Sequence, residues 1–414
     1  MDKDRSQIFK IITASVLGTA GSTLLAFSVS LYLLARFGVG QFVLSQALSA
    51  STAIITLTIG GFLVDRVDKK LLMQLLQLLS VGALIIGWIW STSIITLYIM
   101  IFLLRAADGI FSNNNIAAAI GQVEGDHIGP LRGYEQTGTS IVAVVTPMLA
   151  AVIYPLISIR GVIGIEIVCE LLVLVVMSTV DFHRYHVESA VDDEQSTSFG
   201  DSFRSGWQYI FNRRVLRIIL LSGLMVNLAG GIGEGITAPF LLKTLHMSTG
   251  TYGVAEGMMS VGTILGGLVA VRLMRAEQNM IKSLFLWIVV DGVALIAWSL
   301  TAFISWLPVA WILAIVFGAT TGLALSALNI PLVSWLSATV EPGMQGRVFS
   351  TFIGVAQLVM AAGGFIATAA VHVLPLWLLL AIDGAIGVAV YAVGQLLGVA
   401  NTPEAKVVLQ QQNG

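Results

Sequence analysis

Residues 60–70 of this 414-residue chain read GGFLVDRVDKK, where an apolar run ends in two glycines and five charged residues follow. The apolar run, at about 41–62, is long enough for a helix to cross the hydrocarbon core of a bilayer, which takes about 20 residues. The pattern returns as GGLVAVRLMR at residues 266–275, with the glycines and two basic positions in the same register. We therefore expect a membrane-crossing unit that has been duplicated.

The composition of the whole chain agrees with a membrane protein. Hydrophobic residues make up 57% of the chain and charged residues 11%. Soluble domains average about 25% charged residues, so a water-soluble globular enzyme is excluded.

Chemistry-bearing motifs are scarce. The single cysteine, Cys169, excludes a disulfide framework, and His183 and His186 are the nearest approach to a metal-ligand pair. No phosphate-binding Gly-Lys-Ser/Thr loop and no nucleophile–base–acid set occurs, so direct ATP coupling and catalysis are not expected. We expect no cofactor, no metal and no nucleic-acid partner.

Twelve apolar segments account for most of the chain, which predicts an all-α protein with twelve transmembrane helices. The first segment continues to about Leu34 and is too long for the apolar region of a signal peptide, so we expect it to be retained. The others lie at about 41–62, 71–91, 94–121, 131–154, 157–180, 215–242, 249–271, 280–301, 304–336, 347–371 and 374–399.

The distribution of basic residues sets the topology. An even number of spans puts both termini on one side, and a cytoplasmic N-terminus leaves 17 basic residues inside and three outside. The three are Arg36, Arg160 and Lys243, while Arg105 falls within a span. Because cytoplasmic loops carry the excess of Lys and Arg, both termini are predicted to be cytoplasmic.

One long polar interval divides the spans six from six. Within it Phe199, Phe203, Trp207 and Ile210 recur at near-helical spacing, which predicts an amphipathic helix at the cytoplasmic surface. A tether that covers the bundle is favoured there over a sensing role. The predicted organisation is an N-terminal half at 1–180, a connector at 181–213, a C-terminal half at 214–400 and a tail at 401–414.

This organisation resembles the major facilitator superfamily of transporters, in which two six-helix halves follow one another. GFLVDRVDKK at 61–70 resembles the superfamily's signature loop between helices 2 and 3, and LRAADG at 104–109 resembles its helix 4 motif. VEPGMQGRVFS at 340–350 and LRGYEQ at 131–136 are similar to the branch that contains macrolide-efflux proteins and siderophore exporters. The resemblance implies alternating access around a substrate site between the halves, lined by helices 1, 4, 7 and 10.

Two charged residues in the fourth span are the first candidates for function. A charge at the bilayer centre costs about 2.5–3.5 kcal/mol, so such residues should face the bundle interior and find partners. Arg105 and Asp108 are three residues apart on nearly the same helix face. Either Asp108 binds and releases a proton while Arg105 modulates that step, or the two form a fixed ion pair. The resemblance implies a role for Arg105 in coupling.

The other acids within spans lie on two kinds of helix, those that line the cavity and those that support it. The resemblance places Glu234 on a cavity-lining helix, as a site for a proton or a cationic substrate. Glu166, Glu170, Asp291 and Asp383 lie on supporting helices and are expected to pair with serines and backbone. Polar residues expected to line the cavity or to bond across helices are Asn113, Asn227 and Asn329. The glycine-rich run 227–239 either bends as an outer gate or allows close helix contact.

A cytoplasmic gate is expected at the signature loop. The carboxylate of Asp65 can meet the start of the eleventh helix near Arg347, where the helix dipole is positive. That contact would close the inside and favour the outward-facing state. Gly61 and Arg66 belong to the same motif, and Arg132 is a further partner.

Together these features predict a secondary efflux transporter of a prokaryotic plasma membrane. We expect a monomer in the lipid bilayer that exchanges protons for an amphiphilic or lipophilic small molecule, such as a macrolide, because its spans are apolar with few acids. The alternative of the same fold is a lipid or lysolipid flippase. The alternative of another class is a non-transporting membrane sensor or receptor.

Overall fold

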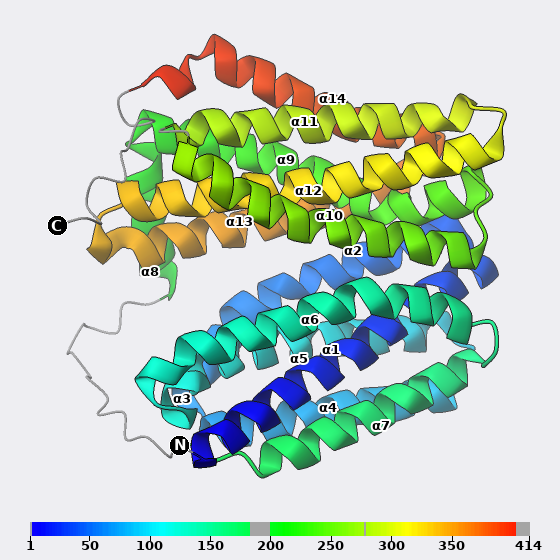
Figure 1. Ribbon diagram of the computed structural model, residues 1–414, viewed down its shortest axis with the longest axis vertical. Helices are drawn as coiled ribbons and strands as arrows, with labels where there is room; N and C mark the ends of the chain where they lie inside the picture. Colours follow the sequence, from blue (N-terminus) through cyan, green and yellow to red (C-terminus); the bar gives the residue numbers. More distant parts are fainter. Residues whose placement is uncertain (1, 183–198, 277–278, 403–414) are drawn as a thin grey trace. The chain divides into compact units, whose positions relative to one another are not determined.

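The computed structural model describes residues 2–182, 199–276 and 279–402. His183, His186 and the first part of the polar connector lie outside these ranges. Contacts group the chain into two units, Met1–Glu194 and Gln195–Gly414, called here the N unit and the C unit. Each unit is described by itself (Figure 1).

The N unit consists of long helices joined by short turns. They are α1 (Asp2–Arg36), α2 (Val39–Ile55), a π-helical turn η1 (Thr56–Gly60), α3 (Gly61–Arg66), α4 (Lys69–Ile89), α5 (Ile94–Gln122), α6 (Gly125–Ile153) and α7 (Ile159–Ser178). Helix α1 packs against α6 and α7, and α4 packs against α5 and α7. Helix α7 is therefore packed on two sides, by α1 and by α4.

The C unit repeats this plan. It contains α8 (Phe199–Phe211), α9 (Arg214–Pro239), the π-helical turn η2 (Phe240–Thr244), α10 (Thr249–Ala276), α11 (Met280–Leu300), the 3₁₀ turn η3 (Thr301–Phe303), α12 (Leu307–Thr339), α13 (Pro342–Ala370), α14 (Leu376–Leu396) and the 3₁₀ turn η4 (Val399–Asn401). Helix α9 packs against α13 and α14, and α11 packs against α12 and α14.

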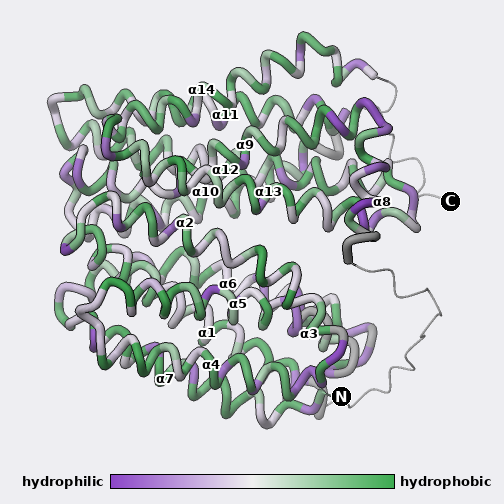
Figure 2. The backbone as a smooth tube through the Cα atoms, turned by 180° about the vertical axis from the view of Figure 1, so that it is seen from behind, coloured by the Kyte–Doolittle hydropathy of each residue, from purple (hydrophilic) through white to green (hydrophobic). Residues whose placement is uncertain are grey.

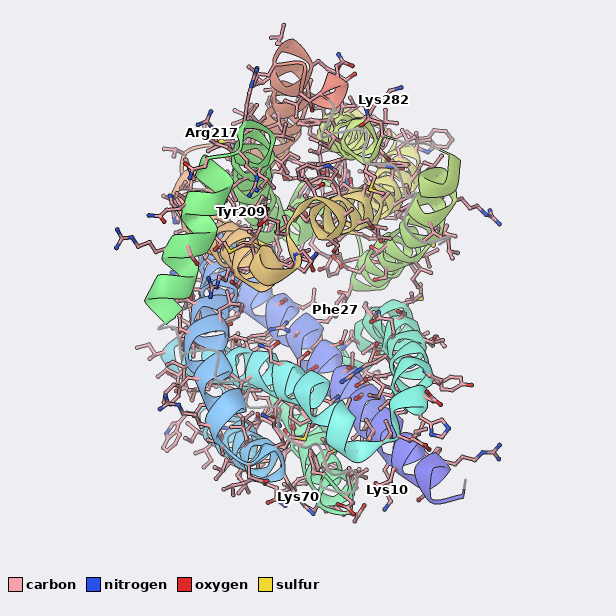
Figure 3. All side chains as sticks on the ribbon, turned by 90° about the vertical axis from the view of Figure 1, so that its left-hand side faces the viewer. Lys10, Phe27, Lys70, Tyr209, Arg217 and Lys282 are labelled. Carbon is pink, nitrogen blue, oxygen red and sulfur yellow. The ribbon has the colours of Figure 1, made fainter. Side chains whose placement is uncertain are left out.

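Twelve helices in the described ranges are long and apolar enough to cross a membrane, which confirms the predicted all-α fold of twelve spans. Figure 2 shows hydrophobic residues along most of the length of these helices and hydrophilic ones gathered toward helix ends. Within each unit, labelled basic side chains stand at such ends: Lys10 and Lys70 in the N unit, Arg217 and Lys282 in the C unit (Figure 3).

Side chains at the turns explain where several helices begin. Asp68 accepts a hydrogen bond from the backbone N–H of Leu71 (2.9 Å) and so caps α4. Asn279 accepts one from Lys282 N–H (2.9 Å) and caps α11, the corresponding helix of the C unit. Such caps satisfy backbone donors that the first turn of a helix leaves without partners.

The duplication seen in the sequence is also present in the packing. A Cβ atom on Gly60 would press on Ile110, the seventeenth residue of α5. A Cβ atom on Gly266, its partner in the repeated motif, would collide with Leu323, the seventeenth residue of α12. Both glycines permit the second and fourth membrane helices of their unit to approach closely.

Helix α9 carries the glycine-rich run and continues without interruption to Pro239, where the π-helical turn η2 begins. Gly231 faces the backbone of α13, since a Cβ there would lie 2.8 Å from the carbonyl carbon of Met360. Gly233 faces the carboxylate of Asp383 on α14. Two of these glycines therefore serve close helix contact.

Candidate functional site

Arg105 and Asp108 lie one turn apart on α5. Arg105 is exposed and Asp108 is partly buried, and within the described part of the chain no ion pair joins them. Their charges are still close enough to interact. The charge of Asp108 also interacts with those of Glu166 and Glu170 on α7.

Glu166 and Glu170 are among the most deeply buried charged-type residues of the N unit, at 2% and 4% exposure. Gln77 of α4 faces Glu170. Oε2 of Glu166 has no hydrogen-bond partner and lies against α1 at Gly21, where a side chain would collide with it. The expected pairing of Glu166 with serine or backbone is therefore absent at this oxygen. We call Asp108, Glu166 and Glu170 the acid cluster of the N unit.

Outside the acid cluster, one carboxylate of the N unit is surrounded by hydrogen-bond donors. Glu135 of α6 accepts hydrogen bonds from Ser15 of α1 (2.5 Å), from the amide of Asn115 of α5 (2.8 Å) and from Arg132 (2.6 Å). Arg132 also donates to the backbone carbonyl of Asn115 (2.8 Å). All of these contacts are donations to Glu135, as expected for an ionised carboxylate that ties three helices together.

The signature loop is held by specific contacts. Nζ of Lys69 donates to the carbonyl of Val64 at the end of α3, and Asn114 of α5 donates to the carbonyl of Lys69 (2.8 Å). The guanidinium of Arg66 lies 4.3 Å from the ring centroid of Phe62. Gly61 has open space where a side chain would stand. The Asp65 side chain lies outside the described residues, so its gate contact stays a prediction.

The predicted residues of the C unit are spread over three helices. Glu234 is exposed on α9 and interacts with Glu256 of α10. Tyr252, one turn earlier on α10, donates its hydroxyl hydrogen to the Glu256 carboxylate. Asn227 and Asn329 each donate 2.8 Å hydrogen bonds to a carbonyl four residues earlier in their own helix.

The three consecutive asparagines of α5 divide their roles. Asn113 is exposed, whereas Asn114 and Asn115 are buried and make the cross-helix bonds described above. Residue identity alone gave no reason to choose among three adjacent amides.

Arg347 lies in the first turns of α13, partly buried, where the backbone approaches α8. A Cβ atom on Gly206 of α8 would lie 2.9 Å from the carbonyl carbon of Arg347. Nearby, Arg213 pairs with Glu341 (2.7 Å) and stacks over the ring of Tyr209 (3.5 Å). These contacts fix α8 against the start of α13.

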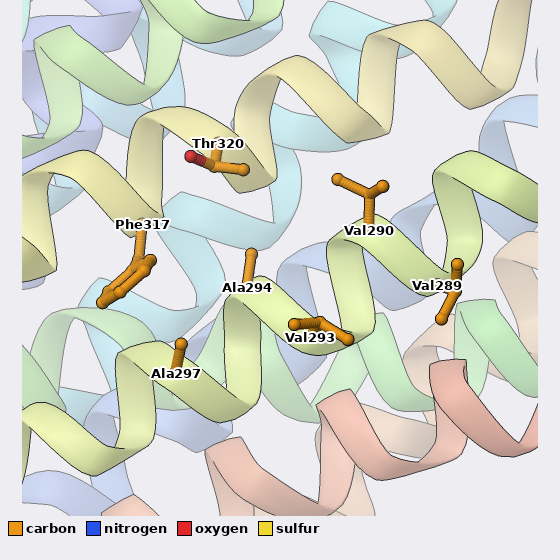
Figure 4. Close-up of a pocket in the computed structure, with 7 residues that line it drawn as sticks. All are labelled: Val289, Val290, Val293, Ala294, Ala297, Phe317 and Thr320. Carbon is orange, nitrogen blue, oxygen red and sulfur yellow. The ribbon is translucent and has the colours of Figure 1, made fainter.

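One groove of the C unit is almost entirely apolar. It has a volume of about 340 Å³ and lies between α11 and α12 (Figure 4). Its lining residues are Val289, Val290, Val293, Ala294, Ala297, Phe317 and Thr320. Because the hydroxyl of Thr320 is the one polar side-chain group of this lining, the groove suits hydrocarbon and cannot orient a polar ligand.

A family model described as Major Facilitator Superfamily matches residues 11–368. The chain belongs to this superfamily. It is accordingly a multi-pass membrane transporter and not an enzyme, and twelve apolar spans with bacterial relatives make it a protein of the cell membrane.

Three transporters of Bacillus subtilis (strain 168) are similar in sequence to this chain. The uncharacterised MFS-type transporter YkuC is 21% identical over 357 residues, which is 82% of this chain and 79% of the relative. The similar transporter YfmI is 30% identical over 95 residues, 23% of each chain, and YvqJ is 23% identical over 180 residues. The matches to YfmI and YvqJ cover 23% and 40% of those relatives' own lengths.

Solved superfamily structures share the fold. The nucleoside transporter NupG is 12% identical with a TM-score of 0.73, covering 95% of this chain and 99% of that one. The D-xylose-proton symporter is 14% identical with a TM-score of 0.68, covering 97% and 98%. A peptide transporter POT in complex with sulfate is 12% identical with a TM-score of 0.73, covering 97% and 95%.

Proposed function

We propose that this superfamily member exports an amphiphilic or lipophilic small molecule in exchange for protons. The observation that carries the proposal is the acid cluster of the N unit. Three carboxyl groups inside the spans, those of Asp108, Glu166 and Glu170, are close enough for their charges to interact, and Arg105 on α5 interacts with Asp108. Like carboxyl groups at short range in an apolar surrounding cannot all be charged, so a cluster of this kind holds exchangeable protons.

The outward direction and the branch rest on the sequence. The segments at 131–136 and 340–350 are similar to macrolide-efflux proteins and siderophore exporters. Among the solved relatives, one is a proton symporter by its name, which supports a proton as the coupling ion. Few polar side chains in the spans favour a substrate that is mostly apolar.

We assign roles to the candidate residues on this basis. Asp108 exchanges the proton and Arg105 modulates that step. Glu234, exposed on α9 and beside Glu256, binds a cationic group of the substrate or a second proton. Asn113 offers an exposed amide for the substrate. The remaining cavity residues are Asn227 and Asn329. The gate residues are Gly61, Asp65, Arg66, Arg132 and Arg347.

The test is flux in proteoliposomes that contain the full chain, with ethidium and erythromycin as probes and an imposed pH gradient. We expect probe accumulation to follow the gradient and to stop when an ionophore collapses it. Asp108→Asn should abolish gradient-driven flux, while Asp126→Asn, which removes an exposed acid in the first turn of α6, should not. Flux of both probes that is indifferent to the gradient would refute proton exchange.

The apolar groove on α11 and α12 favours a second candidate, a flippase for lipid or lysolipid. Its lining matches an acyl chain, and Val293 at its edge is 55% exposed. The same proteoliposomes decide the question with a fluorescent lysolipid, by measuring whether the label changes leaflet. Flux of ethidium without leaflet exchange would exclude the flippase.

A further inference from the structure

The surroundings of Glu166 differ from those of the other described acids of the N unit. Its side chain is 2% exposed, its Oε2 has no hydrogen-bond partner, and this oxygen lies against the backbone of α1 at Gly21. A buried carboxylate without a partner is costly, whereas the neutral acid is tolerated. Because Gly21 has no side chain, the carboxyl group of Glu166 can lie against the α1 backbone.

The repeat of the chain provides an independent second observation. Glu166 is the eighth residue of α7, and Asp383 is the eighth residue of α14. Asp383 lies against Gly233 of α9 just as Glu166 lies against Gly21 of α1. Each unit thus places a buried acid of its sixth membrane helix on a glycine of its first. A contact kept in both copies indicates a built site rather than chance packing.

The two copies differ in which helix supplies a second acid. In the N unit it is Asp108, the fifteenth residue of α5, which is partly buried and whose charge interacts with that of Glu166. In the C unit the fifteenth residue of α12 is Thr321, and the acid that interacts with Asp383 is Asp291 of α11. The second acid of the N unit gives Glu166 a neighbour with which it can exchange a proton.

We propose that Glu166 is a proton-binding site at the contact between α1 and α7, loaded through Asp108. The proposal rests on the proton exchange proposed above and names a second residue for it. With its proton, Glu166 packs neutrally on Gly21. Without the proton, a charge stands on the α1 backbone, and α1 must separate from α7 or admit water. The site thereby connects proton exchange to the position of the first helix.

The groups that face Glu166 are few. From α7 come Glu170 and Cys169, from α5 comes Asp108 with Arg105 behind it, and α4 contributes the uncharged Gln77 to Glu170. Helix α1 carries no titratable residue between Gly18 and Ser28. No base therefore faces Glu166 directly among the described residues, and the acids around it favour its neutral form.

The first measurement reads the proton without transport. Infrared absorption of the protonated carboxyl C=O stretch is recorded for the purified full chain in lipid nanodiscs near neutral pH. We expect Glu166→Gln to lose the intensity of one protonated carboxyl. Glu135→Gln is the matched control, because Glu135 accepts three hydrogen bonds and should contribute nothing to this band. Identical bands for wild type and Glu166→Gln would overturn the proposal.

The second measurement reads coupling. Glu166→Gln should reduce pH-gradient-driven ethidium flux to the level of protein-free liposomes while ethidium self-exchange without a gradient continues, and Asp126→Asn, which removes an exposed acid of α6, should keep gradient-driven flux. Unchanged gradient-driven flux in Glu166→Gln would overturn the coupling role. If wild-type flux ignores the gradient, the proposed function fails, but the infrared band still decides whether Glu166 holds a proton. Should the amide variant not fold, Glu166→Asp must retain the band and Glu166→Ala must lose it.

Discussion

Two adjacent glycines of α9 offer a sharp test of the packing described above. A Cβ atom on Gly231 would lie 2.8 Å from the carbonyl carbon of Met360 and 3.2 Å from the backbone nitrogen of Gly364, both on α13. At Gly230 nothing lies within 4 Å of the same atom. We therefore expect Gly231→Ala and Gly230→Ala to change stability in opposite directions.

The magnitudes follow from the contacts. The obstacle at Gly231 is backbone, which cannot rotate away, so the two helices must move apart, and overpacking of this kind costs about 1–3 kcal/mol. At Gly230 the substitution replaces the poorer helix former by the better one, which contributes up to about 1 kcal/mol. The two variants should then differ by about 1–4 kcal/mol in free energy of unfolding.

The assay is equilibrium unfolding of each full-length variant in mixed detergent and SDS, followed by tryptophan fluorescence. Ethidium flux at a temperature where both variants are folded shows whether the same contact matters for transport. Equal stability of the two variants, or a more stable Gly231→Ala, would refute the close approach of α9 and α13.

Three further predictions concern the polar contacts. Glu135→Gln should destabilise the chain by about 2–3 kcal/mol, because it breaks a mostly buried charge-assisted network, whereas Glu341→Gln breaks an exposed pair and should cost less than about 1 kcal/mol; the same SDS titration compares them. Asp68→Ala should cost about 1 kcal/mol through loss of the α4 cap, and Asp68→Asn should restore most of it in that titration. Asp65→Asn should shift the transporter toward the inward-facing state, and spin-label distances across the cytoplasmic ends that match wild type would contradict the proposed gate.

The fold was predictable from the sequence because each span carries its own signal. Apolar length and the charges that follow each span depend on neighbouring residues alone, and the twelve segments expected from them correspond to the twelve helices found. The repeated glycine motif predicted a duplicated unit, and in the structure Gly60 and Gly266 have equivalent places in the packing of the two units.

The candidate site was harder to predict from the sequence, because it depends on how the helices are rotated against one another. Ser15, Asn115 and Glu135 come from three helices, and nothing in their separate segments indicates that they meet. The only local signal was an acid three residues after Arg132 within the quoted segment. Glu166 was expected to be structural because its helix is a supporting one, and only the structure shows that its Oε2 is buried against Gly21 without a hydrogen-bond partner.

The glycine contacts also differ in kind between the units. In the N unit the described glycines that meet an obstacle meet side chains, such as Val173 for Gly18 and Met100 for Gly87. In the C unit Gly262, Gly363 and Gly384 each meet the backbone of a neighbouring helix. A side chain can change rotamer and let two helices slide, whereas two backbones in contact cannot. During a transport cycle the helices of the N unit should therefore be able to slide at these side-chain contacts, whereas the backbone contacts at Gly262, Gly363 and Gly384 should stay fixed.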